Sequence, residues 1–189
     1  MSQAELLKEA VRALDGAGVG YLLSGSLASS LQGEPRATHD IDLVAELDPR
    51  MIDALAAVFG ADRYFFDEIA ARDALQRRGM FNLIDTMSGD KLDLWILTDT
   101  PFDRSRFDRR VLVEVFGIEV AVSAPEDTML QKLVWSDKSG GSERQLRDAI
   151  GVYEVQAGFL DEEYLDRWAE ELGVTHLLAE VRQTAHQGE

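Results

Sequence analysis

Leu22–Val44 reads Leu-Leu-Ser-Gly-Ser-Leu-Ala-Ser-Ser-Leu-Gln-Gly-Glu-Pro-Arg-Ala-Thr-His-Asp-Ile-Asp-Leu-Val and joins an apolar strand to an acidic one. The apolar run Tyr21–Leu23 enters a turn of small residues, Ser24-Gly25-Ser26. A short helical segment, Leu27–Gln32, and a loop with glycine and proline follow. The segment ends on a strand that carries carboxylates at alternate positions, Asp40 and Asp42.

The alternation places both carboxylates on one face of the predicted strand. Side chains at positions i and i+2 of a β-strand point the same way, so Asp40 and Asp42 project together while Ile41 and Leu43 face the core. Two like charges held close together repel each other unless a cation lies between them. Carboxylate oxygens suit Mg2+ or Mn2+, so Asp40 and Asp42 are candidate metal ligands. The alternative is the solvated face of an edge strand.

The turn before the acidic strand is a candidate phosphate site. Gly25 and Ser26 carry no bulky side chain and begin the predicted helix. A turn of this kind exposes backbone N–H groups and a helix N-terminus, and both favour phosphate. An ordinary turn without a ligand is the alternative.

The ordered combination of these features resembles the polymerase-β-type nucleotidyltransferase superfamily. Its pattern is Gly-Ser on a strand-to-helix turn, an Asp-hydrophobic-Asp-hydrophobic strand and a third carboxylate on a neighbouring strand. Thirteen residues separate Ser26 from Asp40 here. Asp93 is the expected third carboxylate, because the alternation in Lys91–Leu97 leaves apolar residues for the core. Asp85 and Asp90 compete for this role, although Asp90 lies in a predicted turn where aspartate is favoured for local reasons.

The resemblance implies the chemistry of nucleotidyl transfer. Two Mg2+ or Mn2+ ions held by Asp40, Asp42 and Asp93 would align an NTP with a hydroxyl acceptor. Asp93 would also accept the proton of the attacking hydroxyl. The products are a nucleotidylated acceptor, which is an RNA end, a protein or a small molecule, and pyrophosphate.

Two basic residues are carried over from the same resemblance. Arg36 lies in an Arg-x-Thr sequence just before the acidic strand, where members of the superfamily orient the strand or contact phosphate. Lys132 precedes Arg144-x-x-Arg147-Asp148, a pattern similar to the AbiEii-like toxins of bacterial toxin–antitoxin systems. The resemblance therefore implies that Lys132 contacts triphosphate and that an antitoxin-like protein is a partner. The alternative for each residue is an exposed surface charge, and the roles of Arg144 and Arg147 stay open.

Periodicity and turn signals predict an α/β (α+β) fold in two regions, or one continuous domain. Helices and strands alternate to about Val122, which predicts a mixed sheet, and the resemblance implies a polymerase-β-like core over residues 1–122. Residues 123–189 read as helices that form a C-terminal cap. Phe102–Arg110 mixes arginines with aspartates and is predicted to be a solvated connector, with a contact to a polyanion as the alternative.

Composition excludes several classes of protein. The chain has no cysteine, which excludes disulfides, thiolate nucleophiles and zinc–thiolate sites. No apolar run approaches the ~20 residues that cross a bilayer, and the N-terminus lacks a signal-peptide layout, so we expect a cytoplasmic protein. The net charge of −16 gives little general attraction for nucleic acid, so a nucleic-acid substrate would need a local basic surface.

Two other functions fit the same residues. One is a non-catalytic nucleotide-binding or regulatory protein that keeps the fold, although the presence of Asp40, Asp42 and Asp93 argues against a lost activity. The other is a Mg2+-dependent phosphohydrolase that uses the same carboxylates. Fold alone does not separate these functions.

Overall fold

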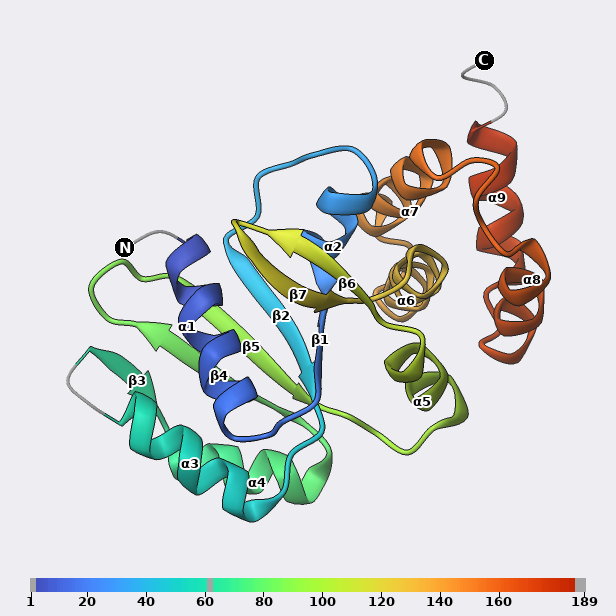
Figure 1. The fold of residues 1–189 in the computed structure, drawn as a ribbon. Coiled ribbons are helices and arrows are strands. Elements are labelled where there is room, and N and C mark those ends of the chain that lie inside the picture. The colour runs from blue at the N-terminus through green and yellow to red at the C-terminus, as the bar shows by residue number, and fades with distance from the viewer. Residues whose placement is uncertain (1–2, 61–62, 186–189) are drawn as a thin grey trace. The chain divides into compact units, whose positions relative to one another are not determined.

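The computed structural model describes residues 3–60 and 63–185, and these form two compact units (Figure 1). The first unit runs to Ser24 and then from Thr38 to Val122. The second unit consists of Gly25–Ala37 and the chain from Ser123 onward. The predicted regions and the observed units both divide after Val122. The structure, however, groups residues 25–37 with the C-terminal helices rather than with the predicted 1–122 core.

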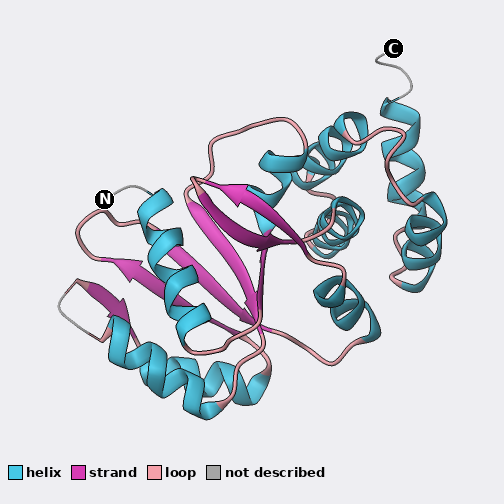
Figure 2. Ribbon diagram, viewed as in Figure 1, coloured by secondary structure: helices cyan, strands magenta, loops and turns pink. Residues whose placement is uncertain are grey.

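The described part of the first unit contains one mixed sheet of seven strands, in the order β3-β4-β5-β2-β1-β7-β6 (Figure 2). β2 is parallel to β5 and antiparallel to β1, and β1 is parallel to β7. This mixed α/β sheet confirms the predicted fold class. The strands are β1 (Tyr21–Ser24), β2 (Asp40–Ala45), β3 (Tyr64–Phe66), β4 (Met80–Asp85), β5 (Lys91–Ile96), β6 (Val111–Val115) and β7 (Ile118–Val122).

Helices α1 (Gln3–Gly16), α3 (Pro49–Phe59) and α4 (Glu68–Arg77) belong to the same unit. In α1, apolar side chains at helical spacing form a fully buried stripe, which explains why the predicted helix forms. The start of α3 is fixed by Asp48, whose carboxylate accepts two backbone N–H groups of the first turn.

The prediction of a connector at Phe102–Arg110 is wrong, because residues 101–108 form helix α5 (Pro101–Asp108). Thr100 caps its N-terminus by accepting the backbone N–H of Asp103. Phe107 is buried against a cluster of core residues from β1, β2 and the end of β5, and Phe102 is also buried. Two buried rings therefore outweigh the polar composition that suggested a solvated segment.

The second unit is helical in its described part. Gln32, at the end of α2, joins the two segments of this unit, because its side-chain amide donates to the Ser123 carbonyl. Gly33 follows and lies against α7, where a Cβ would be only 2.6 Å from the Val152 nitrogen. Only glycine allows this approach. The helices are α2 (Gly25–Gln32), α6 (Pro125–Lys138), α7 (Glu143–Val155), α8 (Glu162–Glu171) and α9 (Thr175–Ala185).

Across residues 3–60 and 63–185, none of the helices has both the length and the apolar character that a bilayer span requires.

Candidate functional site

The turn at the start of α2 forms as predicted. β1 ends at Ser24, and Gly25 continues the chain into α2 with a φ of 66°. This left-handed conformation strains residues with a Cβ and explains the glycine. The strand-to-helix junction therefore leaves the first backbone N–H groups of α2 without partners inside the helix.

The pairing of β2 with β5 brings the predicted carboxylates together in the first unit. The parallel register places Asp42 opposite Asp93, and Asp40 opposite Lys91. Side chains at paired positions of adjacent strands lie on the same face, as do those two residues apart. We call Asp40, Asp42, Lys91 and Asp93 the acidic cluster.

Lys91 is the cation of this cluster. Its Nζ lies 3.0 Å from Asp93 Oδ2 and 3.7 Å from Asp40 Oδ1. The hydrogen bond to Asp93 raises the pKa of Lys91, and partial burial opposes this shift only in part. The lysine therefore stays charged at neutral pH and offsets part of the repulsion between the carboxylates.

The other partners in the cluster orient its carboxylates. Asp93 has a side chain that is only 10% exposed, and its Oδ1 accepts a hydrogen bond from the Asn82 amide of β4. Asp42 Oδ1 accepts a hydrogen bond from Trp95 Nε1 at 3.2 Å. The strands thus hold these two acidic side chains by neutral donors as well as by charge.

The cluster has the donor chemistry for a divalent cation. In the described parts of the chain, no three acidic or histidine side chains already surround a single point. Two carboxylates, those of Asp40 and Asp93, nevertheless reach one ammonium group, which shows that a single cation can bridge them. Their hard oxygen atoms are the ligand type that Mg2+ or Mn2+ takes in proteins.

The competing carboxylate Asp85 has a local role. Its side chain is fully buried at the end of β4, where Oδ1 accepts the backbone N–H of Met87 at 2.8 Å. Oδ2 forms an ion pair with Arg63 at 3.2 Å. Asp90, the other competitor, lies in the connection between β4 and β5. The register therefore favours Asp93 as the partner of the β2 carboxylates.

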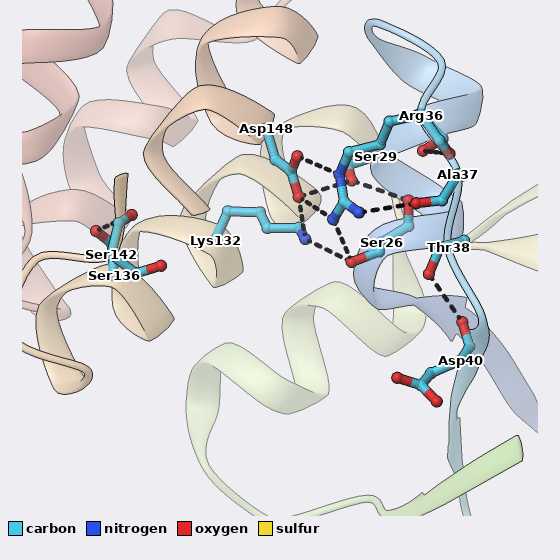
Figure 3. A network of polar contacts seen from close by, with 11 residues as sticks. Ser26, Ser29, Arg36, Ala37, Thr38, Asp40, Lys132, Ser136, Ser142 and Asp148 are labelled. Atoms are coloured by element: carbon cyan, nitrogen blue, oxygen red, sulfur yellow. Dashed lines mark hydrogen bonds and ion pairs between the residues drawn. The ribbon is translucent and has the colours of Figure 1, made fainter. Parts of the chain in front are cut away.

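The predicted basic residues meet in the second unit, around a carboxylate that sequence reasoning did not assign (Figure 3). Asp148 of α7 accepts two hydrogen bonds from Arg36, at 2.7 and 2.8 Å, in a bidentate pair. Lys132 of α6 donates to Asp148 Oδ2 at 2.6 Å. Arg36 and Lys132 also reach Ser26 Oγ, at 2.6 and 3.4 Å. We call these four residues the Asp148 network.

The network is largely shielded from water. The side chains of Asp148 and Lys132 are only 7% and 5% exposed, whereas that of Arg36 is 27% exposed. Burial opposes ionisation of Asp148, but the hydrogen bonds from Arg36 and Lys132 outweigh it and lower the pKa of Asp148. The same carboxylate raises the pKa of Arg36. Asp148 and Arg36 are therefore both ionised at neutral pH.

The structure places the basic residues of the Arg144-x-x-Arg147-Asp148 pattern differently from its aspartate. Arg144 and Arg147 are exposed on α7, whereas the Asp148 side chain turns inward to the two cations. Within this sequence pattern, Asp148 and not the two arginines marks the position of the network. Neither arginine belongs to the network.

Comparisons with known proteins show the fold. No family model and no curated protein sequence matches the chain. Among solved structures, the antibiotic-resistance factor ANT(2'')-Ia aligns with a TM-score of 0.51 and 13% identity, over 98% of this chain and 97% of that one.

A second structure of ANT(2'')-Ia, in complex with adenylyl-2''-tobramycin, gives a TM-score of 0.52 and 14% identity over 97% and 99% of the two chains. A nucleotidyltransferase-like antigenic protein from Paracoccidioides brasiliensis gives 0.52 and 17% identity over 95% and 91%. At these identities the likeness concerns the fold alone. The chain shares the nucleotidyltransferase fold of these proteins.

Proposed function

We propose that the protein is a metal-dependent nucleotidyltransferase of the polymerase-β type that moves an NMP from an NTP to a hydroxyl acceptor and releases pyrophosphate. The observation that carries the proposal is the parallel register of β2 and β5, which pairs Asp42 with Asp93 and sets Asp40 beside Lys91. Residues 51 apart in sequence become neighbours on one face. A solvated edge strand does not explain this, because β2 is an interior strand of the sheet.

We assign Asp40, Asp42 and Asp93 as ligands of Mg2+ or Mn2+, with two ions during turnover. When bound, these ions would orient the triphosphate and the acceptor and neutralise developing charge. Asp93 is also the carboxylate to which we assign the proton of the acceptor hydroxyl. The hydrogen bond from Asn82 orients the Asp93 carboxylate, and a proton acceptor needs a fixed orientation.

We assign phosphate binding to Gly25, Ser26, Arg36 and Lys132. Two cations converge on Ser26 at the N-terminus of α2, and both supply donors that suit phosphate oxygens. Asp148 positions these two cations by binding both at once.

Among the acceptor classes, we favour a small hydroxylated molecule. A structure of ANT(2'')-Ia, one of the fold neighbours, holds an adenylylated tobramycin. The net charge of −16 also disfavours a polyanionic acceptor such as RNA. An AbiEii-like subgroup with an antitoxin-like partner, and a cytoplasmic location, remain predictions from the sequence pattern.

The test uses purified protein, Mg2+ and each α-labelled NTP in turn, with a small-molecule extract, total RNA and lysate protein as separate acceptors. An Asp40→Asn/Asp42→Asn variant is run beside the wild type. The matched control is Asp53→Asn/Asp73→Asn, which removes two carboxylates from exposed positions on α3 and α4. We expect labelled product with the wild type and the control but not with D40N/D42N.

Turnover by D40N/D42N at the wild-type rate would refute the metal assignment. Release of phosphate and formation of labelled NDP without a labelled acceptor product, under every condition, would instead favour the phosphohydrolase. If no NTP is consumed and none binds in calorimetry with Mg2+, the nucleotide assignment is wrong.

A further inference from the structure

Lys91 occupies an unusual position among the acidic residues of the first unit. It begins β5, is paired with Asp40 of β2 and lies two residues before Asp93. Its ammonium group bridges Asp93 and Asp40 at 3.0 and 3.7 Å. The lysine side chain is 35% exposed, so the ammonium remains close to solvent.

A bridging ammonium and a divalent cation need the same partners. Both are attracted to carboxylate oxygens, and a metal that bridges the same pair of oxygen atoms at about 2.0–2.6 Å would lie close to the ammonium, where two cations repel each other. One of the two must therefore leave when the other binds. A long, flexible lysine stem allows the ammonium to move into solvent without a change in the strand.

We propose that Lys91 is a tethered counter-ion that holds the carboxylates of Asp40 and Asp93 until a divalent cation displaces it, and that it thereby sets the cation concentration the site requires. The inference rests on the proposed function, because it takes these carboxylates as metal ligands. In the metal-free cluster, Lys91 relieves the repulsion between the carboxylates. Because it competes with the cation, it also lowers the affinity of the cluster for metal.

The orientation of Asp93 does not depend on Lys91 alone. The Asn82 amide donates to Asp93 Oδ1, whereas Lys91 binds Oδ2. Removal of the ammonium therefore leaves one oriented oxygen in place. For this reason we expect a neutral residue at position 91 to increase metal affinity rather than to disorder the ligand.

The experiment measures direct Mn2+ binding, from the electron paramagnetic resonance signal of the free ion, without nucleotide or acceptor. Lys91→Met and Lys91→Gln remove the charge, and Lys91→Arg keeps it. Arg50→Met is the matched control, because it changes the net charge equally at a side chain that is 91% exposed. Circular dichroism confirms that each variant is folded.

We expect K91M and K91Q to bind Mn2+ about tenfold more tightly than the wild type, since two competing ion pairs are lost. K91R and R50M should bind within about twofold of the wild type. Equal affinities of K91M and wild type would overturn the role of Lys91 and leave the metal assignment intact. Weaker binding by K91M would make Lys91 a positioning residue and overturn the inference. Absence of binding in every variant would overturn the metal assignment as well.

Discussion

Loss of the Asp148 carboxylate should destabilise the second unit strongly. In Asp148→Asn the side chain keeps its size but loses its negative charge, so the buried cation of Lys132 loses its ion pair with Asp148. The Lys132 side chain is 5% exposed, which leaves little access to water. Removing one partner of a buried ion pair costs about 3–5 kcal/mol. Arg36 is 27% exposed and can turn partly to solvent, so we expect about 3 kcal/mol, the lower end of this range.

The assay is urea denaturation at pH 7, monitored by tryptophan fluorescence. Two of the chain's three tryptophans, Trp135 and Trp168, belong to the second unit. A Trp95→Phe background removes the third, so the signal reports the second unit alone. With a slope of about 1–3 kcal/mol per molar urea, a loss of about 3 kcal/mol lowers the midpoint by about 1–3 M.

Two further variants separate charge burial from a general loss of a carboxylate. Asp166→Asn removes one of the two carboxylates that pair with Arg182 on the surface, where the aspartate side chain is 62% exposed, and should change the midpoint far less. Lys132→Met in the D148N background removes the buried cation that has lost this ion pair, and it should recover much of the loss. If D148N shifts the urea midpoint no more than D166N does, the network is not a coupled buried ion pair. The same conclusion follows if K132M lowers the midpoint of D148N by a further shift of equal size.

Three other outcomes follow from the same physical arguments. The pKa of Asp148 is lower in the folded protein than in the unfolded chain, where it is near 3.9, so the unfolded chain binds the proton first as the pH falls. Stability should therefore decrease below about pH 4. In denaturation curves recorded over a series of pH values, D148N should show a smaller decrease in this range. Gly33→Ala should lose about 1–3 kcal/mol in urea denaturation because its Cβ meets backbone atoms of α7 at 2.6 Å. Gly16→Ala, with no atom within 4 Å of the new Cβ, should be neutral or stabilising. Asp161→Ala should cost about 1 kcal/mol in thermal or chemical denaturation, because its carboxylate caps α8 by accepting a backbone N–H at 3.0 Å.

Much of the fold could be predicted because its signals are local. The α1 stripe follows a helical period, and the β1–α2 junction needs the positive φ that Gly25 supplies. The error at α5 has an equally local cause. Four arginines among aspartates conceal Phe102 and Phe107, and composition cannot report that these two rings find a core.

The candidate site was less predictable because its geometry depends on distant pairings. Strand alternation selects Asp40, Asp42 and Asp93 as same-face residues, but only the β2–β5 register shows that Asp42 is paired with Asp93. Lys91 lies two residues from Asp93, yet its bridge to β2 is a product of that same register. Asp148 binds a cation 112 residues away, a contact that no spacing rule contains.

The two clusters have opposite formal charges, and this opposition bears on the ligand. Three carboxylates and one ammonium give the acidic cluster a formal charge of −2 at neutral pH, which favours a divalent cation. Two cations and one carboxylate give the Asp148 network +1, which favours an anion. A metal–nucleotide complex carries both kinds of charge, a bound divalent cation and free phosphate oxygens. Neither cluster alone distinguishes such a complex from a simple ion of the matching charge.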